Sequence, residues 1–169
     1  MISRTMRAAG AAVALAATAF APPLRAGTAD PGGARFYLPG PRDAAIVSVA
    51  AKGAARADVT VLTEAVATKE AGPAEAVKTF GEVYAFSPET IIVHRDEPTR
   101  ITFWNLQADD HHDFALMGAD LRVLMYVDLP PLKKTSWVFT FHRDGLYNFK
   151  CMQHEPAMSG QFLVIPPPR

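Results

Sequence analysis

Residues 144–164 read DGLYNFKCMQHEPAMSGQFLV, and this stretch is the most informative part of the chain. Tyr147, Phe149 and Cys151 alternate with Leu, Asn and Lys, so they share the inner face of a predicted strand. A short loop follows, and Gly160 begins an apolar run that predicts a return strand. The stretch therefore predicts two neighbouring strands, with Cys151 at the inner end of the first.

Three potential metal ligands lie at the end of this strand and in the loop after it. Cys151, His154 and Met158 have the spacing C-x2-H-x3-M. A thiolate, an imidazole and a thioether are soft or borderline ligands, which suit a copper ion that cycles between Cu(I) and Cu(II). A trigonal His2Cys site with a weak axial Met is the ligand set of blue-copper centres, and it requires a second histidine.

The upstream sequence DHHDF, residues 110–114, offers two candidates for that histidine. Adjacent side chains at the start of a strand point to opposite faces, so only one of His111 and His112 can face the metal. The pattern H-x-F favours His112, because Phe114 would then enter the core on the same face, and we expect His111 to face solvent. The predicted ligands of one copper ion per chain are His112, Cys151, His154 and Met158.

Met158 has the strongest competing interpretation among the four. Methionine readily fills irregular gaps in a core, and Met152 lies close by in the sequence. Glu155 or Gln153 could instead supply an oxygen ligand.

From residue 81 onward the sequence consists of short apolar runs separated by turn signals. The runs are rich in β-branched and aromatic residues. We expect about seven strands: Glu82–Ser87, Ile91–Val93, Arg100–Asn105, Asp113–Leu116, Ser136–Phe141, Leu146–Lys150 and Gly160–Ile165. Strands at this density predict an all-β fold, an antiparallel sandwich or barrel.

The first residues have the features of an export signal. Within residues 1–26, two arginines precede the apolar run Ala8–Phe20, which is too short to span a bilayer comfortably. We expect cleavage after Ala21 or Ala26, with an uncleaved N-terminal anchor as the alternative. No later stretch is long and apolar enough to span a membrane, so we expect no membrane insertion of the mature chain.

Residues 27–80 are predicted to form a partly irregular N-terminal extension, and residues 81–169 the folded domain. The expected elements of the extension are an irregular arm over 27–43, short strands over Ala44–Val49 and Ala57–Leu62, and a helix-prone segment over Thr63–Phe80. Gly72-Pro73 interrupts that last segment. We assign no chemistry to the extension.

The cysteine count and the net charge limit the functions that this chain can have. Cys151 is the only cysteine, and in an oxidising compartment it is a buried thiol, an intermolecular disulfide partner or a metal ligand. From Gly27 onward 14 Lys and Arg stand against 17 Asp and Glu, a net charge of −3. No basic patch is visible, which argues against a nucleic-acid partner.

The chain resembles the cupredoxin family, especially periplasmic plastocyanin-like and pseudoazurin-like proteins. The matching patterns are G-x-Y-x-F-x-C-x-x-H, then M-x-G, and an upstream strand end followed by H-x-F. The matching residues are Gly145, Tyr147, Phe149, Cys151, His154, Met158, Gly160, Asn105, His112 and Phe114. The resemblance covers residues 83–165. It implies a Greek-key β-sandwich that carries single electrons between periplasmic redox proteins, is a monomer and is not an enzyme.

Two features depart from the family pattern. The gap of three residues between His154 and Met158 lies between the two of amicyanin-like loops and the four of plastocyanin-like loops. Asp113 follows the upstream histidine where many members carry Asn or Ser, so a carboxylate would enter the hydrogen bonding around the site.

Several functions other than electron transfer are compatible with parts of this sequence. A copper-delivery protein would carry Cu(I) without a coloured, reversibly reducible Cu(II) form, and an accessory sandwich would bind no metal. A red-copper site with a carboxylate ligand is conceivable through Glu155. The single Cys151 excludes a binuclear centre that needs two cysteines. Nucleophilic catalysis by Cys151 with His154 lacks a third group that would orient the base.

Overall fold

A computed structural model describes residues 35–168, and the predicted signal peptide, residues 1–26, lies outside them. The strands are β1 (Phe36–Tyr37), β2 (Val47–Ala50), β3 (Ala57–Ala67), β4 (Val83–Ser87), β5 (Thr90–His94), β6 (Thr99–Asn105), β7 (His112–Met117), β8 (Val123–Leu129), β9 (Lys134–Phe141), β10 (Gly145–Lys150) and β11 (Ser159–Ile165), with one helix, α1 (Ala74–Phe80). No helix in this part of the chain is long and apolar enough to cross a membrane.

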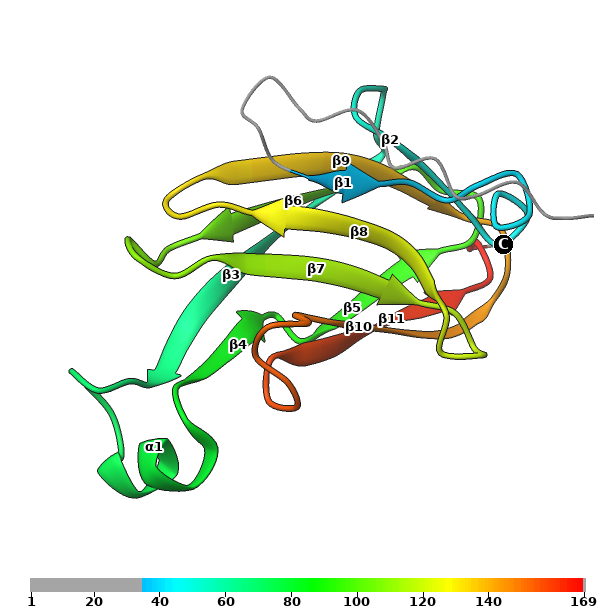
Figure 1. The fold of residues 1–169 in the computed structure, drawn as a ribbon. Helices are drawn as coiled ribbons and strands as arrows, with labels where there is room; N and C mark the ends of the chain where they lie inside the picture. Colours follow the sequence, from blue (N-terminus) through cyan, green and yellow to red (C-terminus); the bar gives the residue numbers. More distant parts are fainter. Residues whose placement is uncertain (1–34, 169) are drawn as a thin grey trace, which may run out of the picture.

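The strands form two sheets that pack face to face (Figure 1). One sheet has the order β1-β8-β7-β10-β11-β5, and the other has the order β2-β9-β6-β3-β4. Neighbouring strands are antiparallel except for the pairs β5–β11 and β3–β6, which are parallel. The chain passes from one sheet to the other between β4 and β5 and again between β5 and β6. The predicted all-β Greek-key sandwich is confirmed.

Three strands of the described part of the N-terminal extension join this sandwich, and two of them, β2 and β3, overlap the short strands expected over Ala44–Val49 and Ala57–Leu62. Strand β1 pairs with β8, β2 pairs with β9, and β3 pairs with both β6 and β4. The reason lies in the alternation along β3, where Val59, Val61 and Thr63 point inward while the residues between them are more exposed. Strand β3 can therefore join the sheet beside β6.

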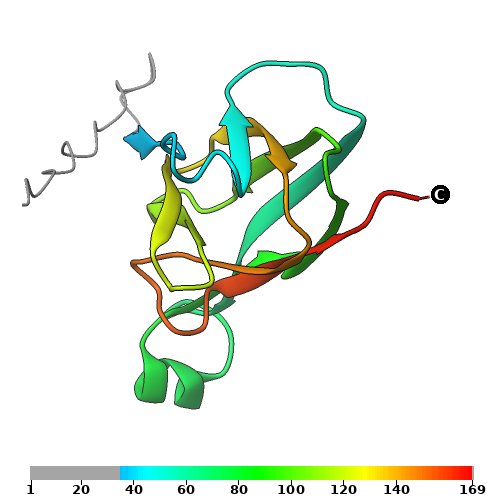
Figure 2. The same ribbon diagram turned by 90° about the vertical axis from the view of Figure 1, so that its right-hand side faces the viewer.

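The helix-prone segment Thr63–Phe80 is helical only in its second half. Residues 63–67 continue β3, because Leu62 to Ala67 pair with β4, and these sheet bonds override the helix propensity of Ala and Glu. The helix α1 begins only after Gly72-Pro73. Figures 1 and 2 both show α1 outside the two sheets, next to the ends of β3 and β4.

An aromatic cluster fills the space between the sheets. Phe114 on β7 lies at its centre, with its ring centroid 4.4 Å from that of Phe103 and 5.2 Å from that of Phe149. Phe86, Phe139 and Phe162 surround the same ring. The cluster places the first residue of β7 and the last residue of β10 at the same end of the sandwich, as the cross-strand pair Lys150–Ala115 shows.

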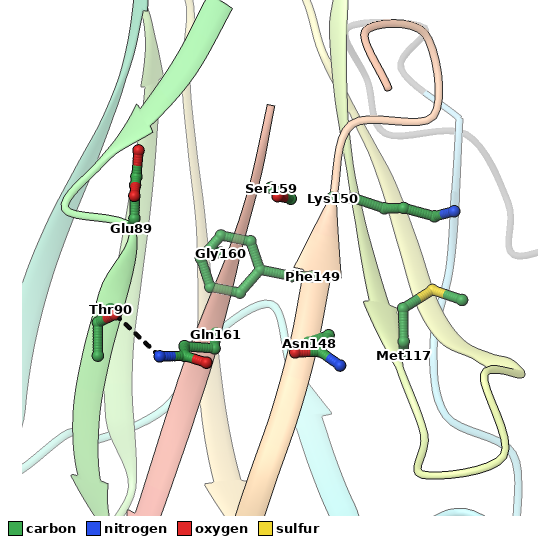
Figure 3. A pocket seen from close by; sticks show the side chains of 9 residues that line it. All are labelled: Glu89, Thr90, Met117, Asn148, Phe149, Lys150, Ser159, Gly160 and Gln161. Atoms are coloured by element: carbon green, nitrogen blue, oxygen red, sulfur yellow. Dashed lines mark hydrogen bonds between the residues drawn. The ribbon is translucent and has the colours of Figure 1, made fainter. Parts of the chain in front are cut away.

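Gly160 lies where β11 passes closest to its neighbours. It is the cross-strand partner of Phe149, and a Cβ atom there would lie 2.5 Å from Phe149 Cζ and closer still to the Glu89 carbonyl oxygen. These three residues line a cavity of about 330 Å³ on the six-stranded sheet. Figure 3 shows them beside the Gln161 amide, which donates to the Thr90 hydroxyl. The cavity contains none of the predicted metal ligands.

We therefore expect Gly160→Ala to lower the free energy of unfolding by about 1–3 kcal/mol, because the added methyl group overpacks the contact with Phe149. Urea unfolding followed by circular dichroism measures this change. Gly40→Ala is the matched control, because a Cβ atom at Gly40 meets no atom within 4 Å. Equal stability of both variants would show that β5 and β10 can move apart at no cost.

Candidate metal centre

Three side chains converge at the end of the sandwich where β7 begins and β10 ends. The Nδ1 atoms of His112 and His154 are 3.0 Å apart. Cys151 Sγ lies 3.5 Å from His154 Nδ1 and 4.0 Å from His112 Nδ1. All three ligand atoms lie within 4.8 Å of one another, so this group could hold a metal ion.

These distances suit a single ion with nitrogen and sulfur ligands. Nitrogen and sulfur atoms bound at about 2.0–2.3 Å to one ion in a trigonal or tetrahedral arrangement lie roughly 3–4 Å apart. The three separations at this site fall in that range. Two imidazoles and one thiolate are also the donors that copper prefers in a trigonal site. The residues present therefore fit a copper ion.

Burial sets the protonation of the free ligands. His112 and Cys151 are fully buried, and His154 is partly exposed. Burial, together with the neighbouring His154, lowers the pKa of His112 to about 4, so this imidazole is neutral at pH 7. Burial also raises the pKa of the Cys151 thiol. A metal ion must therefore displace the thiol proton when it binds.

Asp113 links β7 to the ligand loop. Its backbone N–H lies 3.4 Å from Cys151 Sγ. Its carboxylate accepts hydrogen bonds from the Met152 N–H at 2.8 Å and from the Gln153 amide at 3.3 Å. Because Asp113 is buried, these bonds hold the start of the loop against β7. A carboxylate therefore enters the hydrogen bonding around the site, as expected from Asp113 in the sequence.

The loop after β10 closes on itself at Met158. The Cys151 N–H donates to the Met158 carbonyl at 2.9 Å, and the Met158 N–H donates to the His154 carbonyl at 3.1 Å. The Met158 side chain is fully buried, and its role as the fourth ligand stays a prediction. Of the two alternative ligands, Glu155 pairs with Lys150, and the Gln153 amide nitrogen donates to Asp113.

His111 is separated from the converging ligands. It is exposed and lines a cavity together with Asp113 and Met152. The structure thus brings His112, and not His111, to Cys151 and His154, which agrees with the orientation expected from H-x-F.

Two residues that contact the histidines, Tyr84 and Gln107, were not predicted from the sequence. The Tyr84 ring packs against both imidazoles, with centroid distances of 4.8 Å to His112 and 4.6 Å to His154, and its hydroxyl bonds to Asp110. Burial and Asp110 raise the pKa of Tyr84, which keeps the phenol neutral. Gln107 Oε1 lies 3.0 Å from His112 Nε2. Tyr84 lies in the expected strand Glu82–Ser87, where it alternates with Val83 and Ala85, but nothing in the sequence distinguished Gln107 from other loop residues.

The chain is similar to known proteins in structure but not in sequence. No family model and no curated protein sequence matches the chain. Its structure is similar to that of auracyanin B, with a TM-score of 0.50 and 16% identity over 68% of this chain and 93% of that one.

Two multicopper oxidases have similar structures. The one from Campylobacter jejuni has a TM-score of 0.51 and 9% identity, over 67% of this chain and 31% of the oxidase. The other has a TM-score of 0.50 and 15% identity, over 68% of this chain and 46% of the oxidase. The chain thus spans less than half the length of either oxidase, whereas it spans nearly all of auracyanin B. Together with the two-sheet sandwich, these similarities show that the chain has the cupredoxin fold.

Proposed function

We propose that the chain binds one copper ion in a type 1 (blue) site and acts as a one-electron carrier. The convergence of His112 Nδ1, Cys151 Sγ and His154 Nδ1 supports this function most directly. Copper supplies the one-electron chemistry, because it cycles between Cu(I) and Cu(II) in such a ligand set. Met158 is proposed as the axial ligand, since it is buried in the same loop.

The protein's own residues would keep the site rigid and dry. Asp113 holds the ligand loop against β7, and Tyr84 covers both imidazole rings. Little rearrangement between oxidation states favours fast electron transfer, and a shell of this kind limits rearrangement. The exposed residues Pro156 and Ala157 lie beside His154 in the sequence and form the proposed contact with a redox partner.

The proposed setting is the periplasm, with periplasmic redox proteins as partners and the chain acting as a monomer without enzymatic activity of its own. The predicted export signal supports the location, and similarity over nearly the full length of auracyanin B supports a small carrier over an oxidase. The alternative, delivery of Cu(I), is less well supported. Cys151 and His112 are fully buried, so an acceptor protein could not reach two of the three ligands directly.

The visible absorption spectrum of the purified protein after Cu(II) addition tests the proposal. We expect an intense band from the copper–thiolate bond that disappears in Cys151→Ala and on chemical reduction, and returns on reoxidation. Met158→Ala should shift the band and the reduction potential if the thioether is axial. Met152→Ala is the matched control, because Met152 is exposed on the same loop. A colourless protein that binds only Cu(I), or no metal, would contradict the carrier function.

A further inference from the structure

His112 has a different partner at each ring nitrogen. Nδ1 faces the other two ligands, at 3.0 Å from His154 Nδ1. Nε2 faces away from them, at 3.0 Å from Gln107 Oε1. A neutral imidazole carries one proton, and the nitrogen without it has the lone pair that binds a metal. The group opposite Nε2 therefore determines whether Nδ1 is available.

The orientation of the Gln107 amide follows from Thr63, a fully buried residue of β3. Gln107 Nε2 donates to the Thr63 backbone carbonyl at 3.4 Å. Gln107 Oε1 accepts at 2.6 Å from the Thr63 hydroxyl, whose oxygen lies farther, at 3.0 Å, from Asn105 Oδ1. Rotating the amide by half a turn would place two carbonyl oxygens against each other. The oxygen must therefore be the atom that faces His112.

The Gln107 backbone is held as well. Its N–H donates to Asn105 Oδ1 at 3.0 Å. The Asn105 amide in turn donates to the carbonyls of Asp110 and Leu129, both at 2.8 Å. These bonds tie the loop between β6 and β7 to β8, so Gln107 and His112 keep a constant separation.

We propose that Gln107 is a positioning residue of the copper site, which it serves by accepting the Nε2–H of His112 and so leaving Nδ1 free for the metal. A carbonyl oxygen can only accept, so the Nε2 atom opposite it must be the protonated nitrogen. Thr63 takes part indirectly, because its hydroxyl and carbonyl orient the Gln107 amide. The copper part of this inference rests on the proposed function, but the effect on the His112 tautomer does not.

The tautomer is measured on the metal-free protein by ¹⁵N NMR of the imidazole nitrogens. We expect the Nε2–H form of His112 in the wild type and a mixture of both forms in Gln107→Leu. Gln107→Glu should restore the Nε2–H form, because a carboxylate also accepts this hydrogen bond. Gln161→Leu is the matched control, since the Gln161 amide bonds to Thr90 on another part of the sheet and should leave His112 unchanged.

Copper affinity is measured on the same variants by competition with a chelator. We expect Gln107→Leu to bind copper about 10–100-fold more weakly than the wild type, since loss of such a partner typically costs this much. Gln107→Glu should recover most of the loss, and Gln161→Leu should match the wild type. Thr63→Val keeps the shape of the side chain and should shift the tautomer and the affinity in the same direction by a smaller factor. If Gln107→Leu does not fold, the Thr63→Val variant tests whether Gln107 positions His112.

An unchanged His112 tautomer in both Gln107→Leu and Thr63→Val would overturn the inference, and so would wild-type copper affinity in both variants. If the wild type binds no copper, the proposed function fails. The tautomer measurement then still decides whether Gln107 positions His112. The two failures are therefore distinguishable.

Discussion

Copper affinity is expected to rise about tenfold for each pH unit between about pH 7.5 and pH 9. Burial raises the pKa of the Cys151 thiol above its ordinary value of 9.0, so the thiol form predominates in the metal-free protein over this interval. Binding to the thiolate releases it, and a higher pH therefore favours the bound form. His112 adds no proton to this balance, because its pKa is lowered to about 4 and it is already neutral.

Competition with a chelator of known pH dependence, at constant ionic strength, measures this slope. Cys151→Ala is the control. This variant has no thiol proton to release, so any copper affinity that it retains should not show the tenfold rise per pH unit. A wild-type affinity that does not change with pH would contradict the prediction. It would mean either that copper does not bind through sulfur or that the thiolate already exists in the free protein.

The local pattern around Cys151 was sufficient to predict both the strands beside it and two of the three converging residues, Cys151 and His154. Tyr147 and Phe149 alternate along β10, Cys151 directly follows it, and His154 lies in the loop after it, so no distant contact had to be known. His112 lies far away in the sequence, but its ligand type and the H-x-F pattern identified it. Its partner in the core, Phe114, is indeed buried on β7.

The residues that surround the ligands could not be predicted in this way. Gln107 and Thr63 are 44 residues apart, and they meet only because β3 lies parallel to β6. Tyr84 reaches the histidines from β4, and its hydroxyl meets Asp110 across 26 residues of sequence. Such residue types are common in strands and loops, so their role follows from the pairing of strands and not from a motif.

Strand β8 and the C-terminal part of β3 were not predicted as strands, because their local sequence lacks the alternation or the composition of a strand. Strand β8 has almost no alternation, because Leu124, Met125 and the residues from Val127 to Leu129 are all buried. A run that is buried on both faces lacks the period of two by which strands are identified. The first half of Thr63–Phe80 has the composition of a helix but belongs to β3, where pairing with β4 prevails.

Phe114→Ala is expected to lower the free energy of unfolding by about 3–5 kcal/mol, the range typical for loss of a buried aromatic ring. Phe114 is fully buried, and its ring contacts aromatic side chains from both sheets, including Phe103 on β6 and Phe149 on β10. Removing it leaves a cavity at the junction of the two sheets. Urea unfolding of the metal-free protein measures the change, and no copper is needed for the test.

Phe80→Ala is the control for this prediction. Phe80 ends helix α1 with 72% of its surface exposed, so its removal should change the stability by less than about 0.5 kcal/mol. A small effect of Phe114→Ala would mean that the two sheets are held together without this cluster. The expected large effect has a consequence for the site, because Phe114 is two residues from His112 on the same face of β7. The packing that stabilises the sandwich would then be the same packing that brings His112 to the ligands on the loop after β10.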